Sequence, residues 1–204
     1  MRISVPPGRA GRLWLRRRLA TAEHGLDLLD RKLRLLRQEQ DRLAAVAAQT
    51  GERWAETMAE AEIWTFRVAT LGGERALRLG ASAGQIHVEI DYADVMGTTY
   101  PCSVACHFPA APEQPALTAA LTPARSACQR ALEAGTRHAV ALRAVRIVEA
   151  EVLWTRRRIR ALRERWIPGL ESALAERELA LEEQERADCA RVRRATRDGS
   201  LHYR

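Results

Sequence analysis

Cys102, Cys106 and His107 stand close enough together to suggest a metal site. Thiolate and imidazole groups are the ligands that zinc prefers in structural sites. Such a site needs four ligands, and no second pair with matching spacing follows these three residues. We therefore expect them to be small core residues beneath a hairpin, and we predict no metal ligands and no cofactor-binding residues in the chain.

The basic run Arg156–Arg158 could follow a nucleic-acid backbone. Three consecutive residues of a helix point to different faces, and Glu149, Glu151 and Glu164 flank the run. A solvated helix face or a contact with another protein of a complex is therefore the favoured interpretation. A nucleic-acid-binding helical protein, which would lose affinity steeply with salt, remains an alternative class.

Signals for catalysis are weak. Gly72-Gly73 opens no phosphate-binding loop, and the pattern G-x-x-x-x-G-K-[ST] occurs nowhere. The two helices expected below carry no Glu-x-x-His sets at inward spacings, which a helix-bundle enzyme would need. The tryptophans lie on helical segments, where packing is their expected role: Trp14, Trp54, Trp64, Trp154 and Trp166. We expect no catalytic residues and predict that the chain is not an enzyme.

The composition favours long helices over a broad core. Of 204 residues, 47% are hydrophobic, 29% are charged and only 5% are aromatic, which is typical of coiled coils. The formal net charge is +7, but acidic residues are interleaved with the arginines, so most of the charge predicts a solvated surface. No stretch approaches the roughly 20 apolar residues that span a bilayer, no signal-peptide core opens the chain, and four scattered cysteines form no disulfide framework. We predict a cytoplasmic protein.

A heptad pattern runs from Leu15 to Leu71, and no proline lies between Pro7 and Pro101. A helix from about Gly11 to Leu71 would be about 90 Å long and needs a partner for its apolar stripe. We assign residues 1–72 to this N-terminal helix and expect it to end at Gly72-Gly73. The predicted seam positions are Leu15, Leu19, Ala22, Leu26, Leu29, Leu33, Leu36, Gln40, Leu43, Ala47, Thr50, Trp54, Thr57, Ala61, Trp64, Val68 and Leu71.

Residues 73–115 read as a cap rich in glycine and proline. The run Gln85–Tyr92 alternates polar and apolar residues, which predicts a strand with Ile86, Val88 and Ile90 on one face. A second run, Thr99–Phe108, could pair with it across a turn at Met96-Gly97. The middle segment therefore predicts a small β-hairpin.

Helical periodicity returns from about Ala116, and we assign residues 116–204 to a second long helix. Its spacing is looser than that of the first helix, and at about 120 Å it would overhang its partner. Pro168 predicts a kink or a short break. The predicted fold is all-α: one elongated unit, a long antiparallel two-helix coiled-coil hairpin with a small β-hairpin-containing middle segment. Its apolar positions are Leu132, Leu142, Val145, Val152, Ile159, Leu162, Trp166, Leu170, Leu174 and Leu181.

Motifs in all three segments resemble the D subunit of V-type (archaeal/vacuolar-type) rotary ATPases. The prolines of Val5–Arg9 lead into a basic, leucine-rich helix, Val95–Gly97 precedes Tyr100-Pro101, and the arginine-rich run Thr155–Leu162 precedes Ile167–Glu171. The residues that match the family pattern include Gly25, Met96, Gly97, Pro101, Arg157, Arg158 and Pro168. The order and separation of these motifs make the combination specific, and the resemblance covers nearly the whole chain.

The chain departs from the family pattern at several positions. Gly8 stands where the family usually has Thr, Arg160 where it has Asn, and Arg163 where it has Glu. Asp30 and Leu33 replace basic residues. These departures concern individual contacts and leave the hairpin pattern intact.

The resemblance implies a central rotor stalk. Its partners would be the catalytic and non-catalytic nucleotide-binding A and B subunits of a hexameric ring, the small F subunit of the stalk, and a C (or d) subunit that forms a socket on the membrane ring. Rotation would couple ATP hydrolysis or synthesis to the movement of protons or sodium ions, in a complex peripheral to the membrane. The alternative is a cytoplasmic coiled-coil adaptor or scaffold, which would share the heptads but has no reason to carry the motifs.

Basic residues near both ends of the chain are expected to converge at one pole of the hairpin. We hypothesise that this pole contacts acidic or carbonyl-rich loops of the ring. Exposed ion pairs contribute about 0–1 kcal/mol each, which suits contacts that must exchange. The predicted ring contacts are Arg9, Arg12, Arg16, Arg17, Arg191, Arg193 and Arg194, with Arg18, Arg186 and Arg197 beside them.

Overall fold

The computed structural model describes residues 5–80, 84–109 and 118–201. Helix α1 (Gly8–Gly80) is followed by strands β1 (His87–Val95) and β2 (Thr98–His107) and helix α2 (Leu121–Ala161). A π-helical turn, η1 (Leu162–Trp166), joins α2 to α3 (Ile167–Leu201). The chain forms two compact units: unit 1 contains Met1–Leu33 and Trp154–Arg204, and unit 2 contains Arg34–Leu153.

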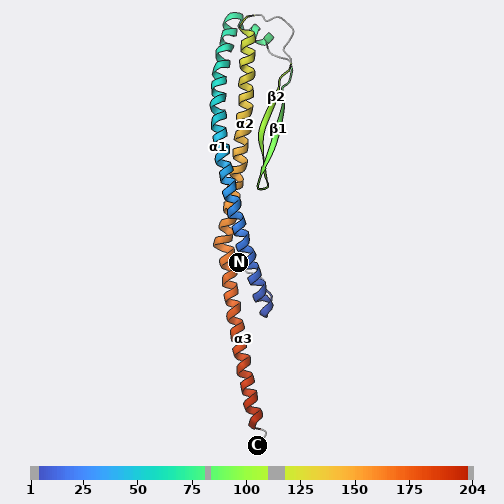
Figure 1. Cartoon of the computed structure of the whole chain (residues 1–204), viewed down its shortest axis with the longest axis vertical. Coiled ribbons are helices and arrows are strands. Elements are labelled where there is room, and N and C mark those ends of the chain that lie inside the picture. The colour runs from blue at the N-terminus through green and yellow to red at the C-terminus, as the bar shows by residue number, and fades with distance from the viewer. Residues whose placement is uncertain (1–4, 81–83, 110–117, 202–204) are drawn as a thin grey trace. The chain divides into compact units, whose positions relative to one another are not determined.

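Within each unit, α1 packs antiparallel to a helix from the second half of the chain (Figure 1). In unit 2, Thr50 contacts His138 and Glu60 contacts Arg130. In unit 1, Arg9 contacts Glu185, whereas Arg16, which lies later in α1, contacts Glu178, which lies earlier in α3. Residue numbers rise along one helix as they fall along the other, so the predicted fold class is confirmed.

The predicted seam of α1 is largely confirmed. Nine of its positions are buried, among them Leu15, Leu36 and Val68, which have no exposed surface. Thr57 is one of the nine, and its hydroxyl donates to the carbonyls of Arg53 and Trp54, so no unpaired donor is buried with it. The prediction is wrong at two positions: Trp54 is 41% exposed and Leu71 is 67% exposed.

The predicted end of the first helix is partly wrong. Gly73 has φ 65° and ψ −175°, a conformation that breaks the helix and that glycine adopts without steric cost. Helical structure resumes after it and continues to Gly80. Gly72-Gly73 therefore divides α1 into two helical segments instead of ending it.

The predicted apolar positions of the second helix are confirmed in part, since Val152, Ile159, Leu170 and Leu181 are buried. In its first part the seam is made by alanines instead: Ala120, Ala124, Ala127, Ala131, Ala134, Ala141 and Ala144 are all buried. Leu132 and Leu142, two of the predicted apolar positions, are 44% and 36% exposed. From residue 120 to 144 the buried alanines keep a heptad spacing. Further on, Val148 and Val152 follow Ala144 at two successive steps of four, and eleven residues separate Ile159 from Leu170 and Leu170 from Leu181. The predicted looseness is therefore found in the second half of the helix and not in the first.

Pro168 acts through the π turn directly before it. A proline has no N–H to donate, so the carbonyl of Glu164 has no ordinary helical partner at this position. The backbone N–H of Ile167 donates to the carbonyl of Leu162, five residues earlier. The chain absorbs the proline as a one-turn π-helix, which is the predicted irregularity in a specific form.

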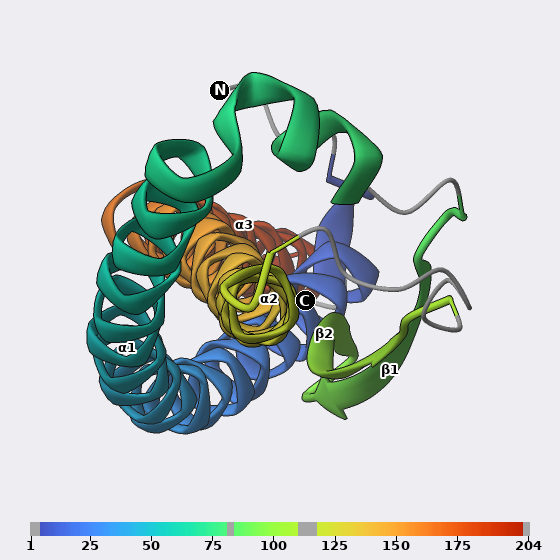
Figure 2. The ribbon, with the colours of Figure 1, turned by 90° about the horizontal axis from the view of Figure 1, so that it is seen from above.

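The predicted hairpin is confirmed. His87 pairs with His107 and Val95 with Thr98, with a bulge opposite Asp91 and Tyr92. Met96 and Gly97 both have positive φ, 52° and 78°, as two-residue hairpin turns of the common type require. The hairpin lies alongside α2 (Figures 1 and 2).

Unit 1 has a small core of its own, in which Leu15 and Leu170 are fully buried and Trp14, Leu19 and Trp166 pack against them. Beyond the ion pair between Arg9 and Glu185, α3 continues past the start of α1 (Figure 1). Every described side chain from residue 182 to 196 is exposed.

Candidate functional site

The basic residues at the start of α1 are tied to α3. Arg9 Nη2 lies 2.9 Å from Glu185 Oε1, and Arg16 Nη2 lies 2.6 Å from Glu178 Oε1. All four side chains reach solvent, so each pair contributes little stability. Two of the predicted ring contacts, Arg9 and Arg16, therefore form ion pairs within the chain itself.

The second basic group lies further along α3. Arg191 pairs with Asp188 at 3.2 Å, whereas Arg193 and Arg194 are exposed and have no ion-pair partner among the described residues. Eight residues separate Glu185 from Arg193, which is about 12 Å along a helix. The two basic groups are therefore offset along α3 instead of meeting at one point.

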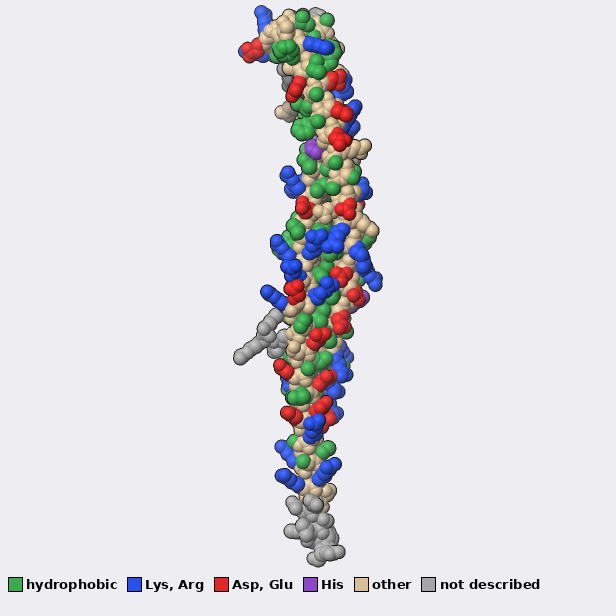
Figure 3. Space-filling model, turned by 90° about the vertical axis from the view of Figure 1, so that its left-hand side faces the viewer, with side chains coloured by type: hydrophobic (Ala, Val, Ile, Leu, Met, Phe, Trp, Pro, Cys, Tyr) green, Lys and Arg blue, Asp and Glu red, His purple; other side chains and the backbone are tan. Residues whose placement is uncertain are grey.

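The other arginines at this end differ in their surroundings. Arg12 is half-buried in the first turns of α1, and Arg17 is exposed. Arg18 lies over the ring of Trp14 at 5.3 Å, and Arg186 pairs with Glu182 at 3.4 Å. Arg197 lies in α3, and its side chain is outside the described part. Acidic and basic side chains are interspersed on the face that Figure 3 displays.

Asp30 and Arg163, both departures from the family pattern, contact each other. Arg163 Nη2 donates to Asp30 Oδ2 at 3.1 Å, from the π turn to α1. An exposed ion pair therefore joins the π turn to α1 in unit 1.

The family-motif residues fall in different places. Gly25, Arg157, Arg158 and Pro168 belong to unit 1, and Met96, Gly97 and Pro101 belong to unit 2. Arg156, Arg157 and Arg158 are all exposed, and the Arg157 guanidinium lies 5.5 Å from the ring of Trp154. A Cβ at Gly25 would meet no atom within 4 Å, so packing within the chain does not require glycine there.

Tyr100 fastens the β-hairpin to α1. Only 4% of Tyr100 is exposed, and its hydroxyl donates to Glu39 Oε1 at 2.5 Å. Arg42 holds the same carboxylate through two hydrogen bonds, of 2.5 and 3.0 Å. No sequence motif points to Glu39 or Arg42, although the Tyr100-Pro101 motif marks one end of this contact.

This contact shifts the ionisation of all three groups. The hydrogen bond from Arg42 is the main cause that lowers the pKa of Glu39. The hydrogen bond to Glu39 raises the pKa of Arg42, and burial, followed by the bond to Glu39, raises the pKa of Tyr100. The ionised Glu39 and Arg42 and the neutral Tyr100 are the forms that the fold favours.

The expected packing role of Cys102, Cys106 and His107 holds only in part. Cys106 is half-buried and its Sγ lies 3.1 Å from Thr136 Oγ1 on α2, but Cys102 and His107 are exposed. Within residues 5–80, 84–109 and 118–201, no group of three or more His, Cys, Asp or Glu side chains is arranged to hold a metal ion.

Trp54 stacks on His138 of α2, with ring centroids 5.6 Å apart. Glycines make room for both rings, since a Cβ at Gly51 would lie 3.0 Å from His138 and one at Gly135 would lie 3.0 Å from Trp54 Nε1. Trp14, Trp64 and Trp166 pack against buried clusters, as predicted, whereas Trp54 and Trp154 are exposed. Packing therefore explains three of the five tryptophans.

A sequence model of one family, the D subunit of ATP synthase, matches residues 13–197. The chain belongs to the ATP synthase D-subunit family. The resemblance drawn from the motifs is thereby confirmed, and the match covers both units. A search of curated proteins gives no match to the chain.

Members of this family are stalk subunits of rotary ATPases and are generally non-catalytic. The chain is therefore a stalk subunit of a rotary ATPase and a component of a membrane-associated complex. In the part of the chain that the structure describes, no helix is long and apolar enough to cross a membrane.

Proposed function

We propose that the chain is the central-stalk rotor of a V-type ATPase. It turns inside the hexameric ring of A and B subunits and couples ATP hydrolysis or synthesis there to proton or sodium-ion movement across the membrane. The small F subunit binds along the stalk, and a C/d subunit forms its socket on the membrane ring. The chain itself supplies no catalytic residue.

One observation carries this proposal: in each unit a continuous seam joins α1 to an antiparallel helix. Leu36 and Val148 are fully buried in unit 2, and Leu15 and Leu170 are fully buried in unit 1. Two helices that pack against each other along their length can transmit torque without a thick core. The family match supplies the complex in which torque is needed.

The unpaired end of α3 is the proposed contact with the ring. Arg193 and Arg194 are exposed there without ion-pair partners among the described residues, and Arg191 is held only by its own helix. Exposed pairs of about 0–1 kcal/mol form and break readily as a rotor passes from one site to the next.

The test is charge reversal of Arg191, Arg193 and Arg194 to Glu in the full complex, followed by rotation and coupled ATPase assays. The matched control reverses Arg31, Arg34 and Arg37, three exposed arginines of α1. We expect loss of coupled activity in the first variant and near-normal activity in the control. Unchanged rotation and coupling in the first variant would show that this end of α3 is not the ring contact.

Failure of the wild-type chain to join a nucleotide-binding ring when it is co-expressed with the neighbouring subunits would overturn the rotor assignment itself.

A further inference from the structure

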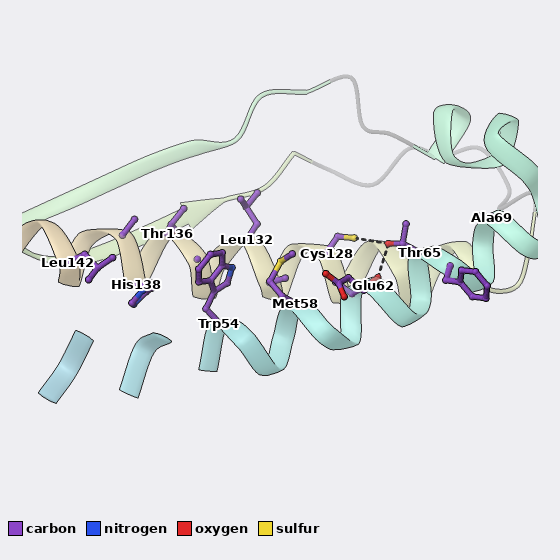
Figure 4. Close-up of a pocket in the computed structure, with 15 residues that line it drawn as sticks. Trp54, Met58, Glu62, Thr65, Ala69, Cys128, Leu132, Thr136, His138 and Leu142 are labelled. Atoms are coloured by element: carbon purple, nitrogen blue, oxygen red, sulfur yellow. Dashed lines mark hydrogen bonds between the residues drawn. The ribbon is translucent and has the colours of Figure 1, made fainter. Parts of the chain in front are cut away.

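The β-hairpin is attached to both helices of unit 2. Near its turn, the Tyr100 hydroxyl donates to Glu39 on α1, and Arg42 holds the same carboxylate. Nearer its open end, Cys106 Sγ lies 3.1 Å from Thr136 Oγ1 on α2. In Figure 4, Thr136 projects from α2 on the side of the hairpin. The hairpin therefore links α1 to α2 outside their seam.

The hairpin keeps a constant length between these two attachments. Tyr100 pairs with Ala93, and Cys106 pairs with Val88. Five steps of β1 separate these two rungs and span about 17 Å. The bulge at Cys102 gives β2 one residue more over the same length. Because β1 has no such reserve, the paired strands cannot lengthen without breaking the hydrogen bonds between them.

The two attachments are offset along the direction in which the helices would slide. Eleven residues separate Glu39 from Thr50 on α1, which is about 16 Å along the axis. Thr50 contacts His138 on α2, and Thr136 lies about 3 Å further on. The axial offset of about 20 Å is thus close to the length of the hairpin between the attachments, and the hairpin lies along α2 (Figures 1 and 2). Sliding of one helix along the other changes this offset directly, so the hairpin opposes it.

The seam between the attachments offers little resistance to sliding. Every buried residue of α2 from Ala124 to Ala144 is an alanine, and the buried residues of α1 from Ala47 to Ala61 are alanines and Thr57. Helices resist sliding where large side chains of one fit between those of the other. Alanine extends one methyl group from the backbone, so its ridges are shallow and the axial position of the helices is weakly fixed by the seam.

The middle of the hairpin is loosely packed on the helices. A cavity of about 230 Å³ lies between residues 101–104 of β2 and the two helices, where Leu43 and Val140 are among the lining residues. On β1, Val88, Ile90 and Tyr92 are 40%, 41% and 64% exposed. The two end contacts are therefore the places where the hairpin takes up force.

We propose that the β-hairpin is a brace that limits sliding of α1 along α2. The brace is a property of the chain itself and needs no partner. Its part in torque transmission rests on the proposed function: twisting two helices that wind around each other also displaces them along each other, so a brace against sliding stiffens the stalk.

Double electron–electron resonance on the full chain measures the sliding. The spin labels are attached to p-acetylphenylalanine at Ala45 of α1 and Ser126 of α2, two exposed sites, so the native cysteines stay in place. Because Thr50 contacts His138, these sites are about 26 Å apart along the axis. Sliding therefore changes the distance between the labels almost one for one.

The test variant is Tyr100→Ala, and the matched control is Tyr92→Ala, which truncates an exposed tyrosine of the same hairpin. We expect Tyr100→Ala to widen the distance distribution about two-fold and Tyr92→Ala to widen it less than about 1.2-fold. Trp54 remains stacked on His138 in both variants, so the shift is a few Å and not a full turn. A wild-type width in Tyr100→Ala, or equal widening by the two variants, would overturn the proposal.

Two further variants keep the test decisive. Tyr100→Phe retains the buried ring and loses the hydrogen bond, so it replaces Tyr100→Ala if that variant loses helical circular dichroism, and it should widen the distribution by a smaller amount. Thr136→Cys places a second thiol beside Cys106, and diamide then oxidises the two to a disulfide. A brace needs both ends, so this disulfide should not narrow the distribution of Tyr100→Ala. A return to the wild-type width would contradict the brace.

The outcomes separate the brace from the proposed function. The spin-label distances are measured on the chain by itself, so failure of the chain to join the ring would overturn the rotor assignment and leave the brace intact. In the full complex, Tyr100→Ala should widen the angular fluctuations of a stalled rotor about two-fold. Unchanged fluctuations, with widened distances in the chain, would overturn the part of the brace in torque transmission.

Discussion

Exchanging the charges of Asp30 and Arg163 should restore a contact that either single change breaks. Arg163→Glu would place a carboxylate against Asp30, where the two groups now lie 3.1 Å apart. Loss of an exposed pair costs about 0.5 kcal/mol, and a like-charge contact adds a similar amount. Asp30→Arg should cost about the same, so each single variant loses about 1 kcal/mol.

The double variant with Asp30→Arg and Arg163→Glu should recover wild-type stability within about 0.5 kcal/mol, because it has the same pair with the signs exchanged. The coupling energy is then about 1–2 kcal/mol. In a chain of this length 1 kcal/mol moves the thermal midpoint by about 2–4 °C, which circular dichroism at 222 nm resolves. The coupling should shrink in 1 M salt, where the screening length is about 3 Å.

The matched control is Arg165→Glu, which reverses an exposed charge in the same π turn. Arg165 has no ion-pair partner among the described residues, so its reversal should shift the midpoint by less than 1 °C and should not be rescued by Asp30→Arg. Equal losses in the double variant and in the sum of the single variants would refute the reasoning, because the two side chains would then act independently.

Three further predictions concern the seam, the hairpin contact and Gly25. Ala127→Leu should lower the free energy of unfolding by about 1–3 kcal/mol, because Ala127 is fully buried and the larger side chain would overpack the seam. Ala150→Leu, at an exposed site, is the control and should change it by less than about 0.5 kcal/mol. Denaturant titrations measure both values. Tyr100→Phe should remove about 1–2 kcal/mol from the hairpin contact at pH 7. Because the fold raises the pKa of Tyr100, the stabilisation by its hydrogen bond is complete below the ordinary tyrosine pKa of about 10 and is lost as the pH rises through the pKa in the folded protein. Because the fold lowers the pKa of Glu39, the stabilisation by the ionised Glu39 is lost as the pH falls below the ordinary glutamate pKa of about 4 and through the lower pKa in the folded protein. Hydrogen exchange of the β2 amides in both proteins across pH would check this, and equal profiles would contradict it. Gly25→Ala should leave the free energy of unfolding unchanged or raise it by up to about 1 kcal/mol, so the melting midpoint should not fall. If this variant keeps its stability but no longer assembles into the complex, Gly25 belongs to an intersubunit contact.

Sequence periodicity predicts the first helix well because its seam uses large residues. Leu15, Leu36 and Val68 are both the strongest apolar signals and the most buried side chains. The hairpin is equally readable, since Met96-Gly97 is a turn signal between two alternating runs. Pro168 locates the helix irregularity but not its form, because a lost donor can be accommodated by a kink, a break or a π turn.

The same reasoning succeeds at Val152, Ile159, Leu170 and Leu181 but fails in the first part of the second helix, because it gives more weight to leucine than to alanine. The alanines from Ala120 to Ala144 form a regular heptad, but their weak hydrophobicity makes Leu132 and Leu142 look like the seam. Only the partner helix decides which stripe is inside, and that information is not local to the helix. For the same reason the sequence suggests neither the contact of Glu39 with Tyr100 nor the pair formed by Asp30 and Arg163, which join residues 61 and 133 positions apart.

The alanine seam also bears on elasticity. Helix axes lie about 8–10 Å apart depending on the side chains between them, with alanine at the small end. The bending resistance of two joined rods grows roughly with the square of their separation, so about 8 Å in place of about 10 Å leaves about two-thirds of the resistance. The length of unit 2 in which α2 presents alanines, residues 120–144, should therefore bend more easily than unit 1, whose contact is made by Leu15, Trp166 and Leu170. In the proposed rotor, this length would store the energy of a discrete chemical step briefly and release it smoothly.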